Sequence, residues 1–171
     1  DSLAACLAAG SERGVLLQMG GELFQARDAV KISSTALCPM ISQRHGYTGR
    51  VVDGKACFYR SAERMDGIRS RLPRPVTKLA ERVELLKCFP GMDENYLNYL
   101  LNDNSRGELQ GLVIEAFGAG NAPPALAGGL EKIAARGIPV ILTTRCIYSG
   151  VHPIYGYDGG GAQLIQAGLI N

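Results

Sequence analysis

Three features that mark particular classes of protein are missing from this sequence. No apolar run approaches the roughly 20 residues that a helix needs to span a bilayer, so the sequence predicts no membrane span. The formal net charge of +2 is too small to indicate binding to nucleic acid or to an anionic membrane surface. The arginine-rich stretch 61–75 also carries Glu63 and Asp66, and no aromatic residues interleave its charges. It is therefore not typical of a nucleic-acid-binding patch.

The five cysteines do not form a cross-linking or metal-binding pattern. They are odd in number and widely spaced, and no CxxC pair occurs among them. This pattern favours reduced thiols in a cytoplasmic protein over a disulfide framework or a zinc site. The two histidines, His45 and His152, are far apart in sequence and have no third ligand pattern, so no metal site is predicted.

The glycine-rich segment 118–123 superficially suggests a dinucleotide-binding loop. Its third glycine position is occupied by Pro123, which lacks the N–H group that would contact a phosphate. The acidic residue expected after the following strand is also missing, and Arg145 stands nearest to that position. The sequence therefore predicts no nicotinamide cofactor, and no other cofactor is expected.

The residues that are present are typical of a folded α/β protein. Hydrophobic residues make up 46% of the chain and charged residues 20%, which is globular rather than disordered. Residues 112–114 and 138–142 are short apolar runs typical of buried parallel strands. Between them lies a helical pattern, with Pro123-Pro124 supplying a proline for its first turn and Gly137 suited to its end. Strand, helix and strand predict a right-handed parallel crossover.

Two further elements extend this crossover into a β-α-β-α-β unit with three parallel strands. A strand is predicted at 83–88, and a helix follows Asp93, whose carboxylate is placed as its cap. A short helix at 162–167 closes the unit. The triplet Gly159-Gly160-Gly161 before it is interpreted as a flexible approach to that helix.

The first part of the chain predicts shorter elements. A helix is expected at 2–9, and two strand pairs are expected at 14–25 and 50–59, the second around an Asp-Gly turn. Residues 36–49 show no clear period and are predicted to form a loop. The proline- and arginine-containing segment at 61–80 is interpreted as a linker between two domains.

Three residues are candidates for a site, and each also has an ordinary structural interpretation. Lys31 is either a solvated lysine at a strand end or a buried lysine that activates a nucleophile. Asn121 follows a strand at the carboxyl edge, where ligands bind in open α/β sheets. Its carboxamide could contact an α-amino acid, although the residues alone favour a helix cap. Tyr157 lies in the same region as Tyr155, and ordinary half-buried packing is the simpler interpretation for both.

Several segments nevertheless resemble one family in order and spacing. They are Gly-Leu-Val-Ile-Glu-Ala-Phe-Gly-Ala-Gly-Asn-Ala-Pro from Gly111, Thr-Thr-Arg-Cys from Thr143, Tyr-Gly-Tyr-Asp-Gly-Gly-Gly from Tyr155, and Arg-Asp-Ala-Val-Lys from Arg27. Together they resemble bacterial-type L-asparaginases of the asparaginase/glutaminase family. The resemblance implies hydrolysis of L-asparagine to L-aspartate and ammonia through a threonyl acyl-enzyme. It also implies a homo-oligomer, dimer or tetramer, whose active sites are shared between subunits.

The resemblance assigns a role to each of the three candidate residues and indicates which part of an asparaginase the chain represents. It implies that Lys31 is the catalytic lysine, that Asn121 reaches a neighbouring subunit's substrate pocket, and that Tyr157 lies near the substrate. The family's Thr-Gly-Gly-Thr and Thr-Asp-Thr segments are not in this sequence. We therefore expect an internal piece of an asparaginase that is inactive alone. Its expected parts are the back of the α/β amino-terminal domain at 1–60, a linker at 61–80, and a parallel three-layer α/β carboxyl-terminal domain at 81–171.

Two other functions stay open on the sequence. One is the ammonia-producing component of an archaeal-type Glu-tRNA amidotransferase, which shares this fold. The other is a non-catalytic module that kept the fold and an amino-acid pocket. The sequence does not separate asparagine from glutamine as the preferred substrate.

Overall fold

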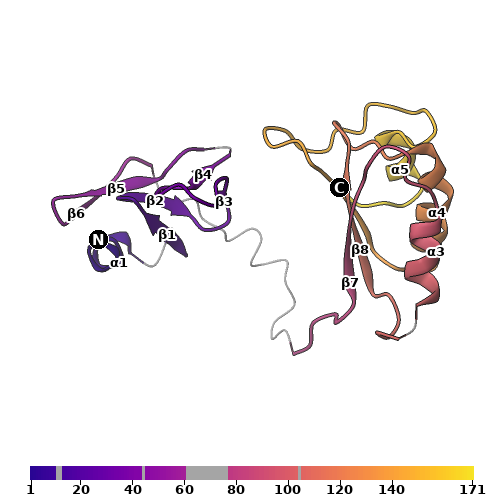
Figure 1. Ribbon diagram of the computed structural model, residues 1–171, viewed down its shortest axis with the longest axis horizontal. Coiled ribbons are helices and arrows are strands. Elements are labelled where there is room, and N and C mark those ends of the chain that lie inside the picture. The colour runs from indigo at the N-terminus through magenta and orange to yellow at the C-terminus, as the bar shows by residue number, and fades with distance from the viewer. Residues whose placement is uncertain (11–12, 44, 61–76, 104) are drawn as a thin grey trace. The chain divides into compact units, whose positions relative to one another are not determined.

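The computed structural model divides the chain into two compact units, Asp1–Val76 and Thr77–Asn171 (Figure 1). The residues that it describes are 1–10, 13–43, 45–60, 77–103 and 105–171. Most of the expected linker at 61–80 lies outside these residues.

The described residues of unit 1 form one helix and two small antiparallel sheets. The helix is α1 (Ser2–Ala9), and the larger sheet has the order β1-β2-β5-β6, with β1 at Leu16–Met19, β2 at Glu22–Gln25, β5 at Gly49–Val52 and β6 at Lys55–Phe58. Asp53 and Gly54 both have positive φ angles, of 49° and 72°, as the two-residue turn between β5 and β6 requires. Ala5, Leu23 and Val51 form the buried centre of this unit. The predicted helix and both strand pairs are confirmed.

The prediction of a loop at 36–49 is wrong in part. Residues Met40–Ser42 form β4, which pairs antiparallel with β3 (Ala29–Lys31) in a separate two-stranded sheet. A three-residue strand is too short to show an alternating pattern in the sequence. Its formation depends on hydrogen bonds to a segment about ten residues earlier, which the local residue pattern does not reveal.

Unit 2 is built on a parallel three-stranded sheet with the strand order β7-β8-β9. The strands are β7 (Val83–Lys87), β8 (Gly111–Ala116) and β9 (Val140–Thr144), and the helices are α3 (Asn95–Asn102), α4 (Pro124–Ala135) and α5 (Gly161–Gln166). The predicted β-α-β-α-β unit and its closing helix are therefore confirmed, with β9 beginning two residues later than expected. Pro124 opens α4 as predicted, and Gly137 has the left-handed φ of 78° expected after its end. Helix α3 has Glu94 at its cap position, while the Asp93 carboxylate accepts the Asn95 N–H.

The helices of unit 2 cover one face of this sheet. Side chains alternate along the strands, so Leu112 and Ile114 of β8 and Leu142 of β9 are buried beneath the helices. In Figure 1, α3 and α4 run along one side of β7 and β8. Leu126, Leu130 and Ile133 lie on one face of α4, as their helical spacing requires, and are each 0% exposed. Within the described part of unit 2, the opposite face of the sheet carries no helix, and Leu85 on that face is 66% exposed.

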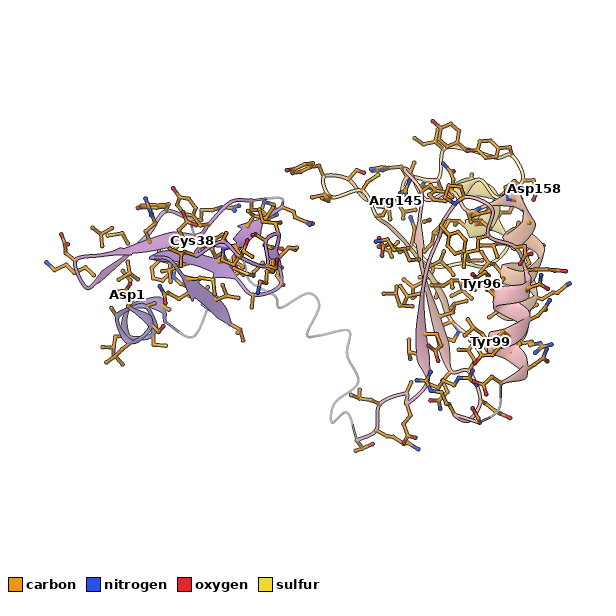
Figure 2. The ribbon with its side chains drawn as sticks, in the orientation of Figure 1. Asp1, Cys38, Tyr96, Tyr99, Arg145 and Asp158 are labelled. Atoms are coloured by element: carbon orange, nitrogen blue, oxygen red, sulfur yellow. The ribbon has the colours of Figure 1, made fainter. Side chains whose placement is uncertain are left out.

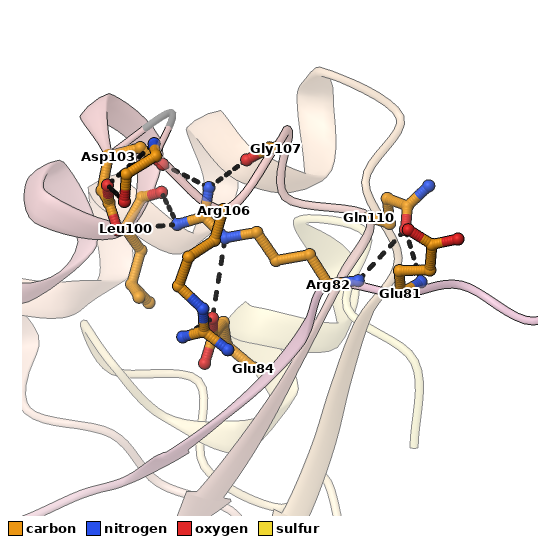
Figure 3. A network of polar contacts seen from close by, with 9 residues as sticks. Glu81, Arg82, Glu84, Leu100, Asp103, Arg106, Gly107 and Gln110 are labelled. Atoms are coloured by element: carbon orange, nitrogen blue, oxygen red, sulfur yellow. Dashed lines mark hydrogen bonds and ion pairs between the residues drawn. The ribbon is translucent and has the colours of Figure 1, made fainter.

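A buried arginine closes the end of this core away from the carboxyl ends of the strands. Arg82 is 4% exposed, and its guanidinium donates to the backbone carbonyls of Leu100, Asp103 and Gly107 (Figure 3). It also lies 3.6 Å from the Glu84 carboxylate. Carbonyls at a helix carboxyl end have no partner in the helix, so a cation there satisfies them and interacts favourably with the helix dipole. The cluster is thus explained by the termination of α3.

Candidate functional site

The candidate site lies at the carboxyl edge of the unit 2 sheet. Three segments meet there: the loop 117–121 after β8, the segment 144–152 after β9, and the turn 155–161 before α5. Backbone hydrogen bonds join them, from the Arg145 N–H to the Ala116 carbonyl at 3.1 Å and from the His152 N–H to the Ala119 carbonyl at 2.9 Å. Figure 2 shows Arg145 at the same end of unit 2 as Asp158. The Ala122 N–H also donates to the Gly159 carbonyl at 2.8 Å, so helix α5 begins beside the loop that follows β8.

The loop after β8 is a tight reversal held by its own backbone. The Phe117 N–H donates to the Asn121 carbonyl at 2.8 Å, and the Asn121 N–H donates back to the Phe117 carbonyl at 2.9 Å. Gly118 and Gly120 have φ angles of 48° and 109°, which side chains rarely allow. A Cβ atom on Gly120 would also lie 2.7 Å from the Val151 side chain. The glycines are explained by this turn, and a phosphate cradle is not needed to account for them.

The Asn121 side chain caps a helix, but not the helix that follows it in sequence. The capping position of α4 is occupied by Pro123, without a side-chain hydrogen bond. Instead, Oδ1 of Asn121 accepts the N–H of Gly161, the first residue of α5, at 3.1 Å. Within the described residues, the amide nitrogen Nδ2 of Asn121 makes no hydrogen bond and is not among the buried atoms that lack a partner. Asn121 is half-buried, and its NH₂ group is left as a donor for a further partner.

The triplet Gly159-Gly160-Gly161 is closely packed. The prediction that it forms a flexible approach to α5 is wrong. All three glycines are buried. A Cβ atom would lie 2.4 Å from the Ala122 carbonyl if added to Gly159, and 2.4 Å from the Tyr155 carbonyl if added to Gly160. The Gly159 carbonyl also accepts the Ala122 N–H at 2.8 Å. The triplet is glycine because two backbone segments pack directly against each other here.

A chain of side-chain hydrogen bonds supports this turn. Oε1 of Gln163 accepts the Gly159 N–H at 2.9 Å, and Nε2 of Gln163 donates to the Glu131 carboxylate on α4 at 2.7 Å. The sequence interpretation missed both residues. The one feature of the sequence that pointed to this turn was the position of Gln163, two residues after the glycine triplet and in the first turn of a predicted helix.

Arg145 places a positive charge beside the loop after β8. Its guanidinium lies 4.7 Å from the centre of the Phe117 ring, a distance at which a cation is attracted to the ring face. The carboxyl edge of the sheet therefore combines a positive charge with the remaining NH₂ donor of Asn121. Both groups suit an anionic or oxygen-rich ligand.

Cys88 lies at the end of β7, just below this edge, and is 1% exposed. Burial raises the pKa of its thiol to about 11, and the nearby Glu115 carboxylate contributes in the same direction. A thiol with this pKa stays protonated at neutral pH and is a poor nucleophile. Cys88 is therefore a packing residue.

Tyr157 and Tyr155 lie beside the glycine triplet. Their ring centres are 5.5 Å apart, and the two residues are 55% and 45% exposed. Their backbone carbonyls accept the N–H groups of Gly160 and Ala162. The structure thus places Tyr157 close in sequence and space to the turn that contacts Asn121, with half of its surface open to solvent.

Lys31 lies in unit 1. It is the last residue of β3, it pairs with Met40 across the sheet, and its side chain is exposed. Ser33, two residues further on, accepts the backbone N–H groups of Thr35 and Ala36, as expected for a structural turn. Asn121 and Tyr157 thus share one edge of unit 2, while Lys31 belongs to the other unit.

Neither a membrane-spanning helix nor a metal-binding cluster occurs in the part of the chain that the structure describes. No helix there is both long and apolar enough to cross a bilayer. No group of three or more His, Cys, Asp or Glu side chains within these residues is arranged to hold a metal ion.

Residues 82–171 match the model of the glutaminase/asparaginase C-terminal domain family. The chain is 36% identical over 162 residues to a probable L-asparaginase of Deinococcus radiodurans, a match that covers 92% of this chain and 46% of that protein. It is 32% identical over 121 residues to a glutamyl-tRNA(Gln) amidotransferase component of Pyrococcus furiosus, a match that covers 69% of this chain and 25% of that protein. The chain thus spans about half the length of the L-asparaginase relative.

Solved structures show the same fold. A probable cytoplasmic L-asparaginase from Campylobacter jejuni superposes with a TM-score of 0.70 at 20% sequence identity. The superposition covers 85% of this chain and 46% of that one. At this level of identity the likeness shows the fold alone.

Proposed function

Because the chain belongs to the glutaminase/asparaginase family, we propose that it is part of an amidohydrolase that converts L-asparagine to L-aspartate and ammonia. The observation that carries this proposal is the extent of the similarity. The family model matches the whole β-α-β-α-β unit, and the similarity to the Deinococcus radiodurans protein extends through unit 1 as well. We further propose that residues 1–60 belong to the amino-terminal domain, 61–80 to a linker, and 81–171 to the carboxyl-terminal domain.

The proposed reaction proceeds through an acyl-enzyme on a threonine outside these 171 residues. A hydroxyl is a weak nucleophile until a base or a nearby charge activates it. We assign Lys31 to this activation because it closes the segment Arg27–Lys31, which matches the family's lysine motif. Its exposed side chain in unit 1 leaves the ammonium group able to meet a carboxylate and a hydroxyl supplied by another part of the protein. The chain alone is then expected to be inactive.

We assign Asn121 to substrate binding across a subunit boundary, with Tyr157 nearby. The remaining NH₂ donor of Asn121 and its place at the carboxyl edge of the sheet support this assignment. The partner is then a second copy of this chain, in a dimer or a tetramer. The substrate is a small amino acid, L-asparagine or also L-glutamine, and the positive charge of Arg145 at the same edge suits its α-carboxylate. We place the enzyme in the cytoplasm, which the pattern of unpaired cysteines favours.

An ammonia-producing component of a tRNA amidotransferase is the second candidate. The similarity to the Pyrococcus furiosus amidotransferase protein favours it, although the match spans less of this chain and less of that protein than the L-asparaginase match does. The two candidates differ in whether hydrolysis needs a partner protein and tRNA.

The test is an ammonia-release assay on the protein expressed from its full reading frame, with the 171-residue chain as a control. We expect ammonia from L-asparagine with the full protein alone and none with the 171-residue chain. Release that requires a partner and tRNA would favour the amidotransferase component. A full protein without Thr-Gly-Gly-Thr and Thr-Asp-Thr segments that binds L-asparagine without hydrolysing it would contradict the enzyme and favour a binding module.

A further inference from the structure

We infer that Gln163 is a positioning residue that fixes the Asn121 carboxamide as a hydrogen-bond donor toward an oxygen acceptor of the ligand. The inference rests on the proposed function for the identity of that ligand. Its structural part stands on the contacts of α4, α5 and the glycine triplet alone.

The orientation of the Asn121 carboxamide is set by the backbone N–H of Gly161. An N–H group can be met only by an acceptor, so the oxygen of the carboxamide must face Gly161 and the NH₂ group must face away. The distance of 3.1 Å from the Gly161 nitrogen to Oδ1 is that of an ordinary hydrogen bond. A rotation that exchanged the two ends of the carboxamide would place two donors face to face. Asn121 therefore offers a donor to the ligand, which favours a carboxylate or carbonyl oxygen over an ammonium group.

The position of the Gly161 N–H depends in turn on Gln163. The Gln163 side chain accepts the Gly159 N–H at 2.9 Å and so closes the turn 159–161 onto the first turn of α5. Its other end donates to the Glu131 carboxylate at 2.7 Å, which ties α5 to the middle of α4. One side chain thus links the packed core helix α4 with the turn that orients Asn121. Contacts of this kind hold a binding group more precisely than a loop alone does.

The remaining contacts of the turn come from backbone packed too closely for side chains. Gly159 and Gly160 each leave room for a carbonyl oxygen at a position where a Cβ atom would lie 2.4 Å away. The Ala122 N–H donates to the Gly159 carbonyl at 2.8 Å, so the residue after Asn121 is held by the same turn. Loss of the Gln163 side chain would release the turn on one side while this backbone packing stays. We therefore expect a local effect rather than unfolding.

Gln166 supplies a matched control. It lies on α5, three residues after Gln163, and is exposed. Gln163→Ala and Gln166→Ala remove the same atoms from the same helix, but only the first removes the hydrogen bonds to Gly159 and Glu131. Both variants are made in the 171-residue chain and in the protein expressed from the full reading frame.

The first measurement is amide hydrogen exchange in the 171-residue chain, which needs no activity. We expect Gln163→Ala to raise exchange at the Gly159 and Gly161 amides by roughly two- to tenfold, the range set by one ordinary hydrogen bond. Gln166→Ala should leave both amides unchanged. Equal exchange in the two variants would overturn the positioning role, whatever the protein catalyses.

The second measurement is a double-mutant cycle on kcat/KM for L-asparagine in the full protein. If Gln163 acts through Asn121, Gln163→Ala should lower kcat/KM by roughly two- to tenfold in the native background and by nothing further in an Asn121→Ala background. Additive losses would show that Gln163 does not act through Asn121 and would overturn the inference. A full protein without any hydrolysis would contradict the proposed function, and the exchange experiment would still decide the positioning of Asn121.

Discussion

The Thr144 hydroxyl donates a hydrogen bond to the Gly118 carbonyl, with 2.6 Å between the two oxygens. The same hydroxyl oxygen accepts the Cys146 N–H at 3.1 Å. One side chain at the last position of β9 thus joins the loop after β8 to the segment after β9. These are two of the three segments that form the candidate site.

This contact predicts a small loss of stability when the hydroxyl is removed. Thr144→Val keeps the shape of the side chain and deletes both hydrogen bonds, so the free energy of unfolding should fall by about 0.5–1.5 kcal/mol per bond at most. Thr143→Val, at the neighbouring position on the opposite face of β9, is the matched control. Urea unfolding of the 171-residue chain measures both, and equal effects would show that the Thr144 contact contributes nothing specific.

Replacing Arg82 should lower the free energy of unfolding much more than replacing Thr144 does. Arg82→Met leaves the Leu100, Asp103 and Gly107 carbonyls without their donor in a buried site, which should cost about 3–5 kcal/mol of unfolding free energy. Arg106→Met removes a guanidinium that is 67% exposed and paired with Glu84, and exposed pairs contribute about 0–1 kcal/mol. Similar losses in the two variants would contradict the structural role assigned to Arg82.

The burial of Cys88 predicts that its thiol reacts more slowly with an alkylating reagent than the other cysteines do. Alkylation at pH 8 should modify the four exposed cysteines and spare Cys88 until the protein is unfolded in urea, and mass spectrometry of the peptides identifies the modified sites. Burial raises the pKa of the Cys88 thiol from 9.0 to about 11, so the folded state binds its proton more tightly than the unfolded state. This difference in thiol pKa between the folded and unfolded states contributes to the free energy of unfolding below pH 9, and the contribution is lost as the pH rises toward 11. Cys88→Ala should lose less stability over that interval.

The orientation of the Asn121 carboxamide predicts different values of kcat/KM for its aspartate and alanine variants. Asn121→Asp keeps an oxygen for the Gly161 N–H and replaces the NH₂ donor by a second carboxylate oxygen. If the group that Asn121 meets is a carboxylate, kcat/KM should fall further with aspartate than with alanine. Hydrogen bonds to charged groups contribute about 1.5–3 kcal/mol, so Asn121→Ala alone should cost roughly ten- to a hundredfold. Activity of Asn121→Asp above that of Asn121→Ala would indicate an ammonium partner instead.

The elements of unit 2 could be predicted well because their signals are local. Apolar runs mark β8 and β9, and proline and glycine mark the two ends of α4. Strand β4 was missed because three residues carry no period and its partner strand lies elsewhere in the chain. The glycine triplet before α5 was misinterpreted because glycine is found both in flexible segments and where two backbone segments pack closely. Only the approach of the Ala122 and Tyr155 carbonyls separates the two explanations.

The candidate site was predicted in part for the same reason. Asn121 was chosen for its position after a strand at the carboxyl edge and for the family resemblance, and its role in substrate binding stays a prediction. Its hydrogen bond to Gly161 spans 40 residues, and no pattern of neighbouring residues indicates it. Gln163 and Glu131 are 32 residues apart, and only the packing of α4 against α5 brings them together.

We propose that Lys31 of one protomer and Asn121 of another serve the same active site. It is tested most directly by mixing full-length Lys31→Met and Asn121→Ala proteins, each inactive or weakly active, under conditions where the exchange of protomers is followed by native mass spectrometry. In a randomly exchanged dimer about a quarter of the sites receive both native residues, because each mixed pair has one intact site of two. We predict that ammonia release from L-asparagine rises toward that fraction as exchange proceeds. Complete exchange with no gain in ammonia release would contradict the shared site.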